Sequence, residues 1–261
     1  MYRMNYDLAL ITGATSGLGK ALCHALAQKN ISLIAVGRDI QKLQLLAKEI
    51  QTPIRIVQVD LSQTNQRASL GTLIQELCPD LVINNAGFGL YGSVVEQPLK
   101  LSQEMLQVNI QAVMECSMEA ASALKKAKKP GLILNISSAA AFFSYPNFSV
   151  YAASKAFVYH FSEALDIELS AYHIRVLTVC PGQIATDFRK KASRNFPQKP
   201  DHLILSCKKV VCLILKQIRQ GKRVQIIDLR YRLMIFLSHF IPKRFLLPFL
   251  QRSLSKRYKK S

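Results

Sequence analysis

The sequence predicts an α/β fold in which a doubly wound parallel sheet of seven strands carries helices on both faces. Three observations lead to this prediction: short apolar runs alternate with helical stretches, the runs are continuously apolar, and 49% of the 261 residues are hydrophobic. Continuously apolar strands separated by helices are typical of parallel sheets that are covered on both faces. Right-handed crossovers between such strands then wind the chain outward in both directions from the middle of the sheet.

The expected strands are apolar runs, and in chain order they are residues 7–12, 31–36, 53–59, 80–84, 131–137, 174–180 and 223–227. The expected helices lie between them, over residues 17–29, 39–50, 62–77, 101–128, 151–172 and 206–220. The first helix ends near Asn30 and the third ends before Pro79, which are residues that commonly stop helices. No internal repeat or low-complexity linker interrupts this pattern before about residue 228. Residues 1–228 are therefore predicted to form one domain.

One segment breaks the alternation of strands and helices. Residues 183–205, QIATDFRKKASRNFPQKPDHLIL, hold two prolines and have mixed polarity. They follow the sixth strand, at the carboxyl edge of the sheet, where open α/β folds bind their ligands. We expect this segment to form a lid over a substrate pocket.

The turn after the first strand, TGATSGLG over residues 12–19, is rich in glycine and opens the first helix. Gly13, Gly17 and Gly19 lack side chains, which lets the backbone approach a pyrophosphate. The free N–H groups and partial positive charge of the helix N-terminus attract the same group. In its strand–turn–helix context the loop indicates dinucleotide binding. A tight turn without a ligand is the alternative.

The end of the second strand favours NADP(H) over NAD(H). At this position an acid reads a ribose 2′-hydroxyl, whereas an arginine accommodates a 2′-phosphate. Gly37 and Arg38 stand here, and Arg38 offers charge-assisted hydrogen bonds to a phosphate. Asp39 follows, and we expect it to cap the next helix. The alternative for Arg38 is a solvated loop charge.

Together with later segments, these residues resemble the short-chain dehydrogenase/reductase family over about residues 1–228. Seven motifs in order carry the resemblance: TGATSGLG (12–19), VDL (59–61), NNAG (84–87), QVNI (107–110), NISSAAA (135–141), YAASK (151–155) and PGQIAT (181–186). The family has a Rossmann fold, and its members transfer hydride between nicotinamide C4 and a carbonyl or secondary alcohol. Gln183 and Ala141 depart from common family residues without affecting the chemistry. Ser16 stands where some NADP-dependent members carry a base, so cofactor choice depends on Arg38.

The resemblance implies a catalytic tetrad of Asn109, Ser138, Tyr151 and Lys155. Tyr151 and Lys155 stand four residues apart, so both side chains lie on one helix face. A free phenol has a pKa of about 10, and a nearby ammonium lowers it towards neutral pH. By resemblance, Tyr151 protonates the carbonyl oxygen and Ser138 hydrogen-bonds that oxygen. Lys155 also binds the nicotinamide ribose, and Asn109 bends its helix and helps to hold a water on the proton path.

The resemblance also implies which residues bind the cofactor. Asp60 is expected to contact adenine, and Thr186 and the backbone of Ile184 are expected to hold the nicotinamide carboxamide. The complete expected set is Gly13, Thr15, Ser16, Gly17, Leu18, Gly19, Arg38, Asp60, Leu61, Asn85, Ala86, Gly87, Tyr151, Lys155, Pro181, Gly182, Ile184 and Thr186. No metal site is expected.

The formal net charge is +19, and nearly half of this excess lies in the C-terminal tail, residues 229–261. The tail holds nine basic residues and no acidic one, and its apolar clusters alternate with the basic ones. Two prolines argue against one long helix. Short amphipathic segments with this composition suit an anionic membrane surface. The alternatives are packing on the core or across a dimer, and nucleic-acid binding, which is not expected because no aromatic stacking pattern is present.

The six cysteines form no CxxC pair and have no zinc-ligand spacing with the five histidines. Most lie in apolar runs, so reduced thiols in a cytoplasmic protein are expected. The N-terminal residues MYRMNYDLAL have no apolar core of signal-peptide length, and no run of 18 apolar residues predicts a transmembrane helix. If the tail binds lipid, the protein is expected to lie peripherally on the inner face of a membrane.

The predicted function is reversible NAD(P)H-dependent hydride transfer between the nicotinamide and an apolar ketone or alcohol of the 3-oxoacyl, steroid or sphingoid type. The segments FGLYG (88–92) and FFSYPNF (142–148) flank the expected cleft with aromatic and aliphatic residues, which favours an apolar pocket. The resemblance implies a homodimer or homotetramer. The alternative function is a catalytically silent NADPH-binding sensor or scaffold that acts through its basic tail, and the intact tetrad argues against it.

Overall fold

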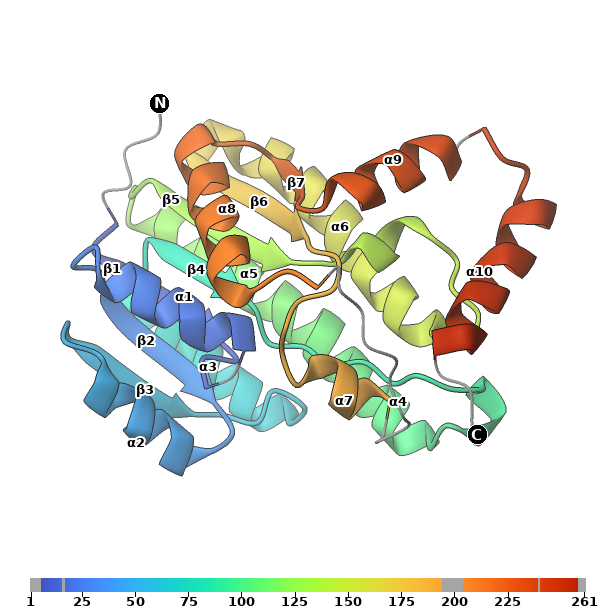
Figure 1. The fold of residues 1–261 in the computed structure, drawn as a ribbon. Helices are drawn as coiled ribbons and strands as arrows, with labels where there is room; N and C mark the ends of the chain where they lie inside the picture. Colours follow the sequence, from blue (N-terminus) through green and yellow to red (C-terminus); the bar gives the residue numbers. More distant parts are fainter. Residues whose placement is uncertain (1–5, 16, 194–203, 239, 258–261) are drawn as a thin grey trace.

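A computed structural model of the chain describes residues 6–15, 17–193, 204–238 and 240–257. In this part of the chain, seven strands form one parallel sheet in the order β3-β2-β1-β4-β5-β6-β7 (Figure 1). The strands are β1 (Leu8–Thr12), β2 (Ser32–Gly37), β3 (Ile54–Gln58), β4 (Leu81–Asn84), β5 (Gly131–Ile136), β6 (Ile174–Cys180) and β7 (Val224–Ile226). The predicted doubly wound sheet of seven strands is confirmed.

The direction of winding reverses between β1 and β4. Strand β1 pairs with β2 on one side and with β4 on the other, and Ile11 lies opposite Ala35 and Ile83. The chain runs outward from β1 to β3 on one side and from β4 to β7 on the other. The connections that leave β1 and β4 therefore diverge at their carboxyl ends, which opens a crevice at this edge of the sheet.

Helices cover both faces of the sheet. On one face lie α1 (Gly17–Ala27), α2 (Ile40–Glu49) and α8 (Cys207–Gln220). On the other face lie α3 (Thr64–Leu77), α5 (Ala112–Lys126) and α6 (Ser149–Leu169). Leu18, Leu22 and Leu26 illustrate why α1 lies down on the sheet: their spacing of four residues aligns them on one face, and all three are buried.

The predicted helix over residues 101–128 is interrupted. It consists of α4 (Leu99–Leu106), a π-helical turn η2 (Gln107–Gln111) and α5. The π-turn contains Asn109, so the expected bend at this residue takes the form of one widened turn. The remaining short helices are the 3₁₀ turns η1 (Val94–Glu96), η3 (Ala139–Phe142) and η4 (Ser170–Tyr172).

A buried polar network lies in the sheet beneath the crevice. Asn84 Nδ2 of β4 donates to Asn135 Oδ1 of β5 at 2.8 Å and to Ser117 Oγ of α5 at 3.0 Å. Asn135 Nδ2 donates to Ser162 Oγ of α6 at 2.9 Å. All four side chains are buried, so each depends on its protein partners for hydrogen bonds. The network fixes α5 and α6 against the two central strands.

The expected lid, residues 183–205, is anchored at its two ends. Ile184 and Leu205 form a parallel bridge, and Ala185 N donates to Leu205 O at 2.9 Å. The segment contains the short helix α7 (Phe188–Ala192). Residues 194–203 of the expected lid lie outside the described residues.

The tail forms two helices, α9 (Leu229–Ser238) and α10 (Lys243–Arg257), which project from one end of the molecule (Figure 1). Ile235 of α9 and Leu250 of α10 are buried in a small apolar cluster with Phe143. Part of the tail therefore packs on the domain. No helix in the described residues is both long and apolar enough to cross a membrane.

Candidate active site

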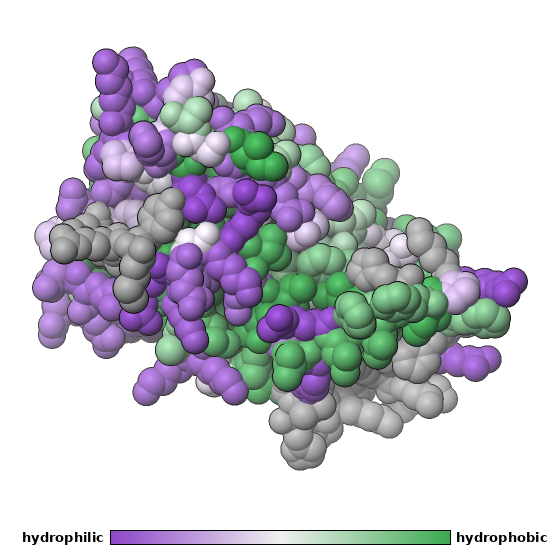
Figure 2. Space-filling view, turned by 90° about the horizontal axis from the view of Figure 1, so that it is seen from above, coloured by the Kyte–Doolittle hydropathy of each residue, from purple (hydrophilic) through white to green (hydrophobic). Residues whose placement is uncertain are grey.

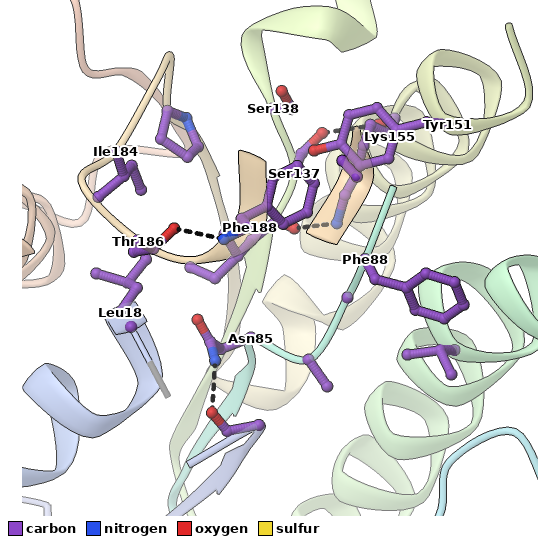
Figure 3. Close-up of a pocket in the computed structure, with 18 of the residues that line it drawn as sticks. Leu18, Asn85, Phe88, Ser137, Ser138, Tyr151, Lys155, Ile184, Thr186 and Phe188 are labelled. Carbon is purple, nitrogen blue, oxygen red and sulfur yellow. Dashed lines mark hydrogen bonds between the residues drawn. The ribbon is translucent and has the colours of Figure 1, made fainter. Parts of the chain in front are cut away.

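A cleft of about 740 Å³ lies at the carboxyl ends of the strands. Its walls are the turns after β1 to β6, together with the first turns of α6 and the start of α9. Figure 3 shows Leu18 and Thr186 on one side of this cleft and Tyr151 and Lys155 on the other. The crevice that the strand order creates is thus the place where the predicted site residues gather.

The turn after β1 uses glycine for two different reasons. Gly13 and Gly17 have φ angles of 65° and 51°, in the left-handed region that glycine adopts without strain. At Gly19 the reason is space, because a Cβ there would lie 2.1 Å from Gly13 O. Gly17 and Leu18, at the N-terminus of α1, line the cleft. A bare backbone beside a helix N-terminus fits the diphosphate of a dinucleotide.

Asn85 ties the turn after β4 to the turn after β1. Its Nδ2 atom donates to Thr12 O at 3.0 Å and to Gly13 O at 3.2 Å. In return, Thr12 Oγ1 accepts from the backbone N–H groups of Asn85 and Ala86, both at 3.0 Å. The two turns that flank the crevice are therefore held at a fixed separation.

The turn after β2 presents positive charge to the cleft. Arg38 is exposed and lines the cleft beside Thr15. Asp39 is the N-cap of α2, as predicted, and its carboxylate accepts from Lys42 N at 3.1 Å and pairs with Lys42 Nζ at 3.0 Å. These hydrogen bonds lower the pKa of Asp39. Lys42, four residues beyond Arg38, also lines the cleft, although none of the sequence motifs marks it.

Asp60 does not line the cleft. Its carboxylate accepts from Ser62 N at 2.9 Å and from Ser62 Oγ at 2.8 Å, so it holds the turn after β3 together. The adjacent residues Val59 and Leu61 line the cleft instead. The VDL segment is therefore at the expected place, but the structure directs its apolar side chains, and not its acid, towards the cleft.

The turn after β6 brings four predicted residues to the cleft: Pro181, Gly182, Ile184 and Thr186. Thr186 Oγ1 accepts from Phe188 N at 3.3 Å, which closes the turn into α7 (Figure 3). The Thr186 side chain also packs closely on the glycine turn, because a Cβ at Gly17 would lie 2.8 Å from Thr186 Cγ2. This contact links the start of the expected lid to the dinucleotide end of the cleft.

Three of the four predicted catalytic residues meet in the cleft. Tyr151 and Lys155 lie one turn apart on the same face of α6, and Ser138 follows β5. Lys155 Nζ donates to Ile136 O at 2.9 Å and lies 5.9 Å from the centroid of the Tyr151 ring. Ser137 Oγ donates to Lys155 O at 2.7 Å, which fastens α6 to the end of β5. The phenol, the hydroxyl and the ammonium are thus presented by two rigid elements.

Burial dominates the electrostatics of this group. Desolvation raises the pKa of Tyr151 to about 12, although a hydrogen bond with Ser138 acts in the opposite direction. Desolvation also lowers the pKa of Lys155 to about 8. The expectation that the ammonium lowers the phenol pKa is therefore not met in the structure, because both groups are almost fully buried. Tyr151 is a protonated phenol at neutral pH, which is the state of a proton donor.

Asn109 is adjacent to the cleft but does not line it. Its Oδ1 accepts from Phe88 N at 3.1 Å, and its Nδ2 donates to Phe88 O at 2.9 Å and to Ser154 Oγ at 3.1 Å. The side chain therefore binds the turn after β4 and helix α6 at once. A Cβ at Gly87 would lie 3.1 Å from Asn109 Oδ1 and 3.3 Å from Lys155 Nζ, so these two side chains border the same glycine.

Aromatic residues surround the phenol. Phe148 stacks on Tyr151 with ring centroids 4.2 Å apart, and Phe188 of α7 lies 5.6 Å from it. The sequence analysis placed Phe148 near the cleft as part of FFSYPNF but did not pair it with Tyr151. Other aromatic residues that line the cleft are Phe88, Tyr91, Tyr145 and Tyr231.

The structure thus brings together most of the predicted site. The predicted residues that line the cleft are Gly13, Thr15, Gly17, Leu18, Arg38, Leu61, Asn85, Ala86, Gly87, Ser138, Tyr151, Lys155, Pro181, Gly182, Ile184 and Thr186. Gly19, Asp60 and Asn109 do not line the cleft themselves, but each lies in an element that forms its wall. Ser16 lies outside the described residues.

Comparisons with known proteins agree with this geometry. The family described as “short chain dehydrogenase” matches residues 7–196. The 17-beta-hydroxysteroid dehydrogenase type 3 of Mus musculus is 31% identical over 211 residues, which cover 78% of this chain and 69% of the relative. Serine 3-dehydrogenase of Rhizobium radiobacter is 32% identical over 182 residues, which cover 69% of this chain and 72% of the relative.

Solved structures show the same architecture. A short-chain dehydrogenase from Sphingobium yanoikuyae in complex with NADPH superposes with a TM-score of 0.80 at 26% identity, over 89% of this chain and 94% of that chain. A bulky-bulky ketone specific alcohol dehydrogenase from Comamonas testosteroni has a TM-score of 0.77 at 27% identity, over 89% and 92%. A 4-hydroxyisoleucine dehydrogenase complexed with NADH has a TM-score of 0.74 at 26% identity, over 85% and 97%.

Proposed function

The chain belongs to the short-chain dehydrogenase family, and from this premise we propose that it reduces an apolar ketone with NADPH, in a reversible hydride transfer. One observation carries the proposal. Ser138, Tyr151 and Lys155 meet on one side of a cleft that Leu18 of the glycine-rich turn borders on the other side, and Arg38 also lines this cleft. A dinucleotide bound along these walls ends beside the phenol.

The cleft has the features that a dinucleotide needs. The glycine turn offers bare backbone and a helix N-terminus for the diphosphate. Gly19 lets this turn close tightly, because a Cβ at this position would clash with Gly13 O. Ile184 and Thr186 are proposed to bind the nicotinamide end of the dinucleotide, and Arg38 and Leu61 are proposed to bind its adenosine end. When bound, the reduced nicotinamide supplies the hydride for the carbonyl carbon.

Tyr151 is proposed as the proton donor to the carbonyl oxygen. A phenol with the ordinary pKa of about 10 is already protonated at neutral pH, and burial raises the pKa of Tyr151 further, so the phenol carries the proton that the reduction of a ketone needs. Ser138 is proposed to donate a hydrogen bond to the same oxygen and so to fix its position. The phenolate left behind regains its proton from solvent, so the net reaction takes one hydride and one proton into the alcohol.

Lys155 and Asn109 are proposed to support this step in different ways. The Lys155 ammonium lies close enough to the Tyr151 ring to stabilise a developing phenolate, and it is also the group assigned to the nicotinamide ribose. Asn109 is assigned to the proton path behind Lys155, because both side chains border Gly87. Its hydrogen bonds to Phe88 and Ser154 hold the turn and helix that flank that path.

NADP(H) is proposed over NAD(H) because of the charges after β2. Arg38 and Lys42 both line the cleft. The only described carboxylate on this turn, that of Asp39, caps α2 and forms an ion pair with Lys42 Nζ. A ribose 2′-phosphate would meet two cations here, whereas a 2′-hydroxyl would find no free carboxylate. The similar structures include one complex with NADPH and one with NADH, so the proposed preference depends on Arg38 and Lys42.

The proposed substrate is a bulky apolar ketone of the 3-oxoacyl, steroid or sphingoid type. Phe88, Tyr91, Tyr145, Phe148 and Phe188 line the cleft around Tyr151, so a substrate there lies among aromatic rings. The relatives named for a hydroxysteroid and for bulky ketones support the same class.

Residues 1–228 are proposed as the catalytic domain, residues 183–205 as its lid and residues 229–261 as a separate tail. The lid proposal is supported by the described part of that segment. Phe188 and Arg189 line the cleft, and Tyr91 N donates to Ala192 O at 2.9 Å, so α7 lies across the substrate end.

A homodimer or homotetramer is proposed through helices α5 and α6. Met118 on α5 and Phe157 and Ile167 on α6 are large apolar side chains that are exposed in the single chain. Burying them against a second copy would remove this apolar surface from water.

A cytoplasmic location is proposed from the cysteines. All six lie in the described part of the chain and are free, and three of them, Cys23, Cys116 and Cys180, are buried. Burial raises the pKa of each of these three thiols to about 12, so they are unreactive core residues.

The test is consumption of NADPH by the full-length protein across a chain-length series of ketones and 3-oxoacyl thioesters, with the variant Tyr151→Phe alongside. Loss of the phenol proton is expected to lower kcat at least about a hundredfold while NADPH affinity changes little. The matched control is Tyr159→Phe, which removes a hydroxyl from the same helix outside the cleft and is expected to keep full turnover.

Two outcomes would contradict the proposal. If Tyr151→Phe consumed NADPH as fast as Tyr159→Phe, Tyr151 would not be the proton donor. If the wild-type protein bound NADPH tightly but reduced no member of the series, the alternative function, an NADPH-binding sensor, would take precedence.

A further inference from the structure

Helix α9 has two apolar faces. The inner face consists of Tyr231, Met234 and Ile235, which pack in the cluster with Phe143 and Leu250. A helix that folds onto a domain needs only this face to be apolar. The opposite face of α9 is apolar as well, and it is exposed.

The outer face is a continuous helical stripe. Leu229, Leu233, Phe236 and Leu237 follow spacings of four, three and one residues, which align them on one side of α9, and Phe240 lies in the turn just beyond the helix. Their exposed fractions are 72%, 58%, 61%, 47% and 72%. The rings of Phe236 and Phe240 lie edge to face with centroids 5.2 Å apart, so they form one joint surface.

Helix α10 and the turn before it extend the same pattern. Leu246 and Leu250 face the inner cluster, whereas Ile241 and Phe245 are exposed. We call the four residues of the outer face of α9, together with Phe240, Ile241 and Phe245, the tail surface. Figure 2 shows that hydrophobic residues gather in the half of the molecule where α9 and α10 project, while the other half is mostly hydrophilic. Exposed apolar surface of this extent marks an interaction site.

Positive charge surrounds the tail surface. The tail has nine basic residues and no acidic one. Among its described side chains, Arg232 and Arg244 are exposed, and the Arg244 guanidinium lies 4.8 Å from the centroid of the Phe245 ring. Arg230 is different, because it pairs with Asp228. The surface is therefore apolar at its centre and cationic at its border.

This charge decides between the possible occupants. A second copy of the chain docked through the same face would bring one set of arginines against another, which is unfavourable. A nucleic acid would match the charge but would leave the exposed phenylalanine and leucine side chains without an apolar partner. An anionic phospholipid surface matches both properties, because its acyl region takes the apolar side chains and its headgroups take the cations.

We propose that the tail surface docks the protein on an anionic phospholipid membrane, with Leu233, Phe236 and Phe240 inserted and Arg232 and Arg244 at the headgroups. The position of α9 gives this docking a consequence for the cleft. Tyr231, on the inner face of α9, lines the cleft and packs on Gly182, where a Cβ would lie 2.3 Å from Tyr231 Cε2. The helix that lies on the membrane therefore also forms part of the cleft wall. If the substrate is the apolar ketone proposed above, its cleft is held close to the membrane that dissolves it.

The test is flotation of the full-length protein with vesicles of phosphatidylcholine, with and without phosphatidylserine. Binding is expected only when phosphatidylserine is present, and it is expected to weaken as salt screens the charges. Phe236→Gln is expected to lower the partition coefficient about tenfold, because one phenyl group is no longer buried. The matched control is Leu45→Gln, an exposed apolar residue of α2, which is expected to have no effect.

A charge variant tests the cationic border separately. Arg232→Gln with Arg244→Gln is expected to lower binding by about fivefold for each charge. Its control, Lys29→Gln with Lys48→Gln, removes two exposed lysines elsewhere and is expected to bind as the wild type does. Circular dichroism and NADPH binding establish that every variant is folded.

The proposal is overturned if the wild-type protein does not float with phosphatidylserine vesicles, or if Phe236→Gln floats as well as Leu45→Gln. A third result would also overturn it: the wild-type protein is an oligomer that does not bind vesicles, and Phe236→Gln sediments as a monomer. The tail surface would then be covered by a second copy of the chain. Vesicle binding requires no turnover, so these outcomes are independent of whether the protein reduces ketones.

Discussion

The ring of Phe148 lies stacked on the ring of Tyr151, with centroids 4.2 Å apart and an angle of 25° between their planes. Phe148 is also the residue that immediately precedes helix α6. The residue at the start of α6 therefore covers the phenol of Tyr151, which lies in the first turn of the same helix. This stacking excludes water from one side of Tyr151, which contributes to the burial that raises the pKa of the phenol.

Phe148→Leu is expected to lower kcat about three- to tenfold, because an aromatic pair of this kind contributes on the order of 1 kcal/mol to the position of the rings. The affinity for NADPH is expected to stay unchanged. Steady-state kinetics and fluorescence titration measure the two quantities. Phe245→Leu, which alters an exposed ring in the tail, serves as the control, and equal kcat values for the two variants would show that the stacking does not position Tyr151.

Arg38→Gln is expected to weaken NADPH binding about tenfold and to leave NADH binding unchanged. The guanidinium can make two charge-assisted hydrogen bonds to a 2′-phosphate, which NADH lacks. Dissociation constants for both cofactors test this. Arg55→Gln removes an exposed arginine from β3 and is the control. An equal loss of affinity for both cofactors in Arg38→Gln would mean that Arg38 binds the diphosphate and does not select NADP.

The affinity for NADPH is expected to fall as pH rises through about 8. Desolvation lowers the pKa of Lys155 to about 8, so the ammonium is present below this pH and is lost above it. An ammonium donates to ribose hydroxyls, whereas the neutral amine donates more weakly. Fluorescence titration from pH 7 to pH 10 measures this dependence, where the wild type is expected to show one step.

Lys155→Met is expected to bind NADPH weakly and without that step, and the exposed-site control Lys48→Gln is expected to retain it. A step of the same size in Lys155→Met would assign the pH dependence to another group.

Asp166 is expected to stabilise the fold at neutral pH and to lose this effect in acid. Burial alone would raise its pKa, but hydrogen bonds from Arg175, from Val176 N and from Arg223 outweigh burial and lower the pKa. Because the folded pKa lies below the unfolded value of about 3.9, the contribution is complete above that pH. It disappears as pH falls through the lowered folded pKa.

Asp166→Asn is expected to lower the free energy of unfolding by about 1–3 kcal/mol at pH 7, and the difference from wild type is expected to shrink below about pH 4. Urea denaturation at several pH values measures it. Glu76→Gln, at an exposed position on α3, is the control. A difference that stays constant down to pH 2 would show that the hydrogen bonds, and not the charge of Asp166, are responsible.

The sheet and its helices could be predicted because their signals are local. A strand buried on both faces is apolar at nearly every position, and β5 shows this over Gly131–Ile136, where Asn135 is the one polar side chain. A helix on a sheet must repeat its apolar residues every three or four positions, as α1 does. Tyr151 and Lys155 were predictable as a pair for the same reason, since a separation of four residues places them on one face of any helix.

Contacts between distant segments were not predictable in this way. Lys42 lines the cleft and Asp60 does not, although the resemblance implied that Asp60 contacts adenine and none of the motifs pointed to Lys42. The outcome depends on how the turns after β2 and β3 fold. Asp60 is held by Ser62 within its own turn, and such a competing local hydrogen bond leaves no mark in the residue spacing.

The sequence by itself determined the order of the strands and helices and the glycine-rich turn, because strand and helix periodicity and tight turns depend on neighbouring residues. The residues of the catalytic group were predicted from the resemblance of their motifs to the short-chain dehydrogenase/reductase family. Only the tertiary structure decided the burial of Tyr151, which raises the pKa of its phenol, the stacking of Phe148 and the division of α9 into a buried and an exposed face. These properties depend on which distant atoms exclude water from a group. Burial is a property of the whole packed chain and not of any segment of it.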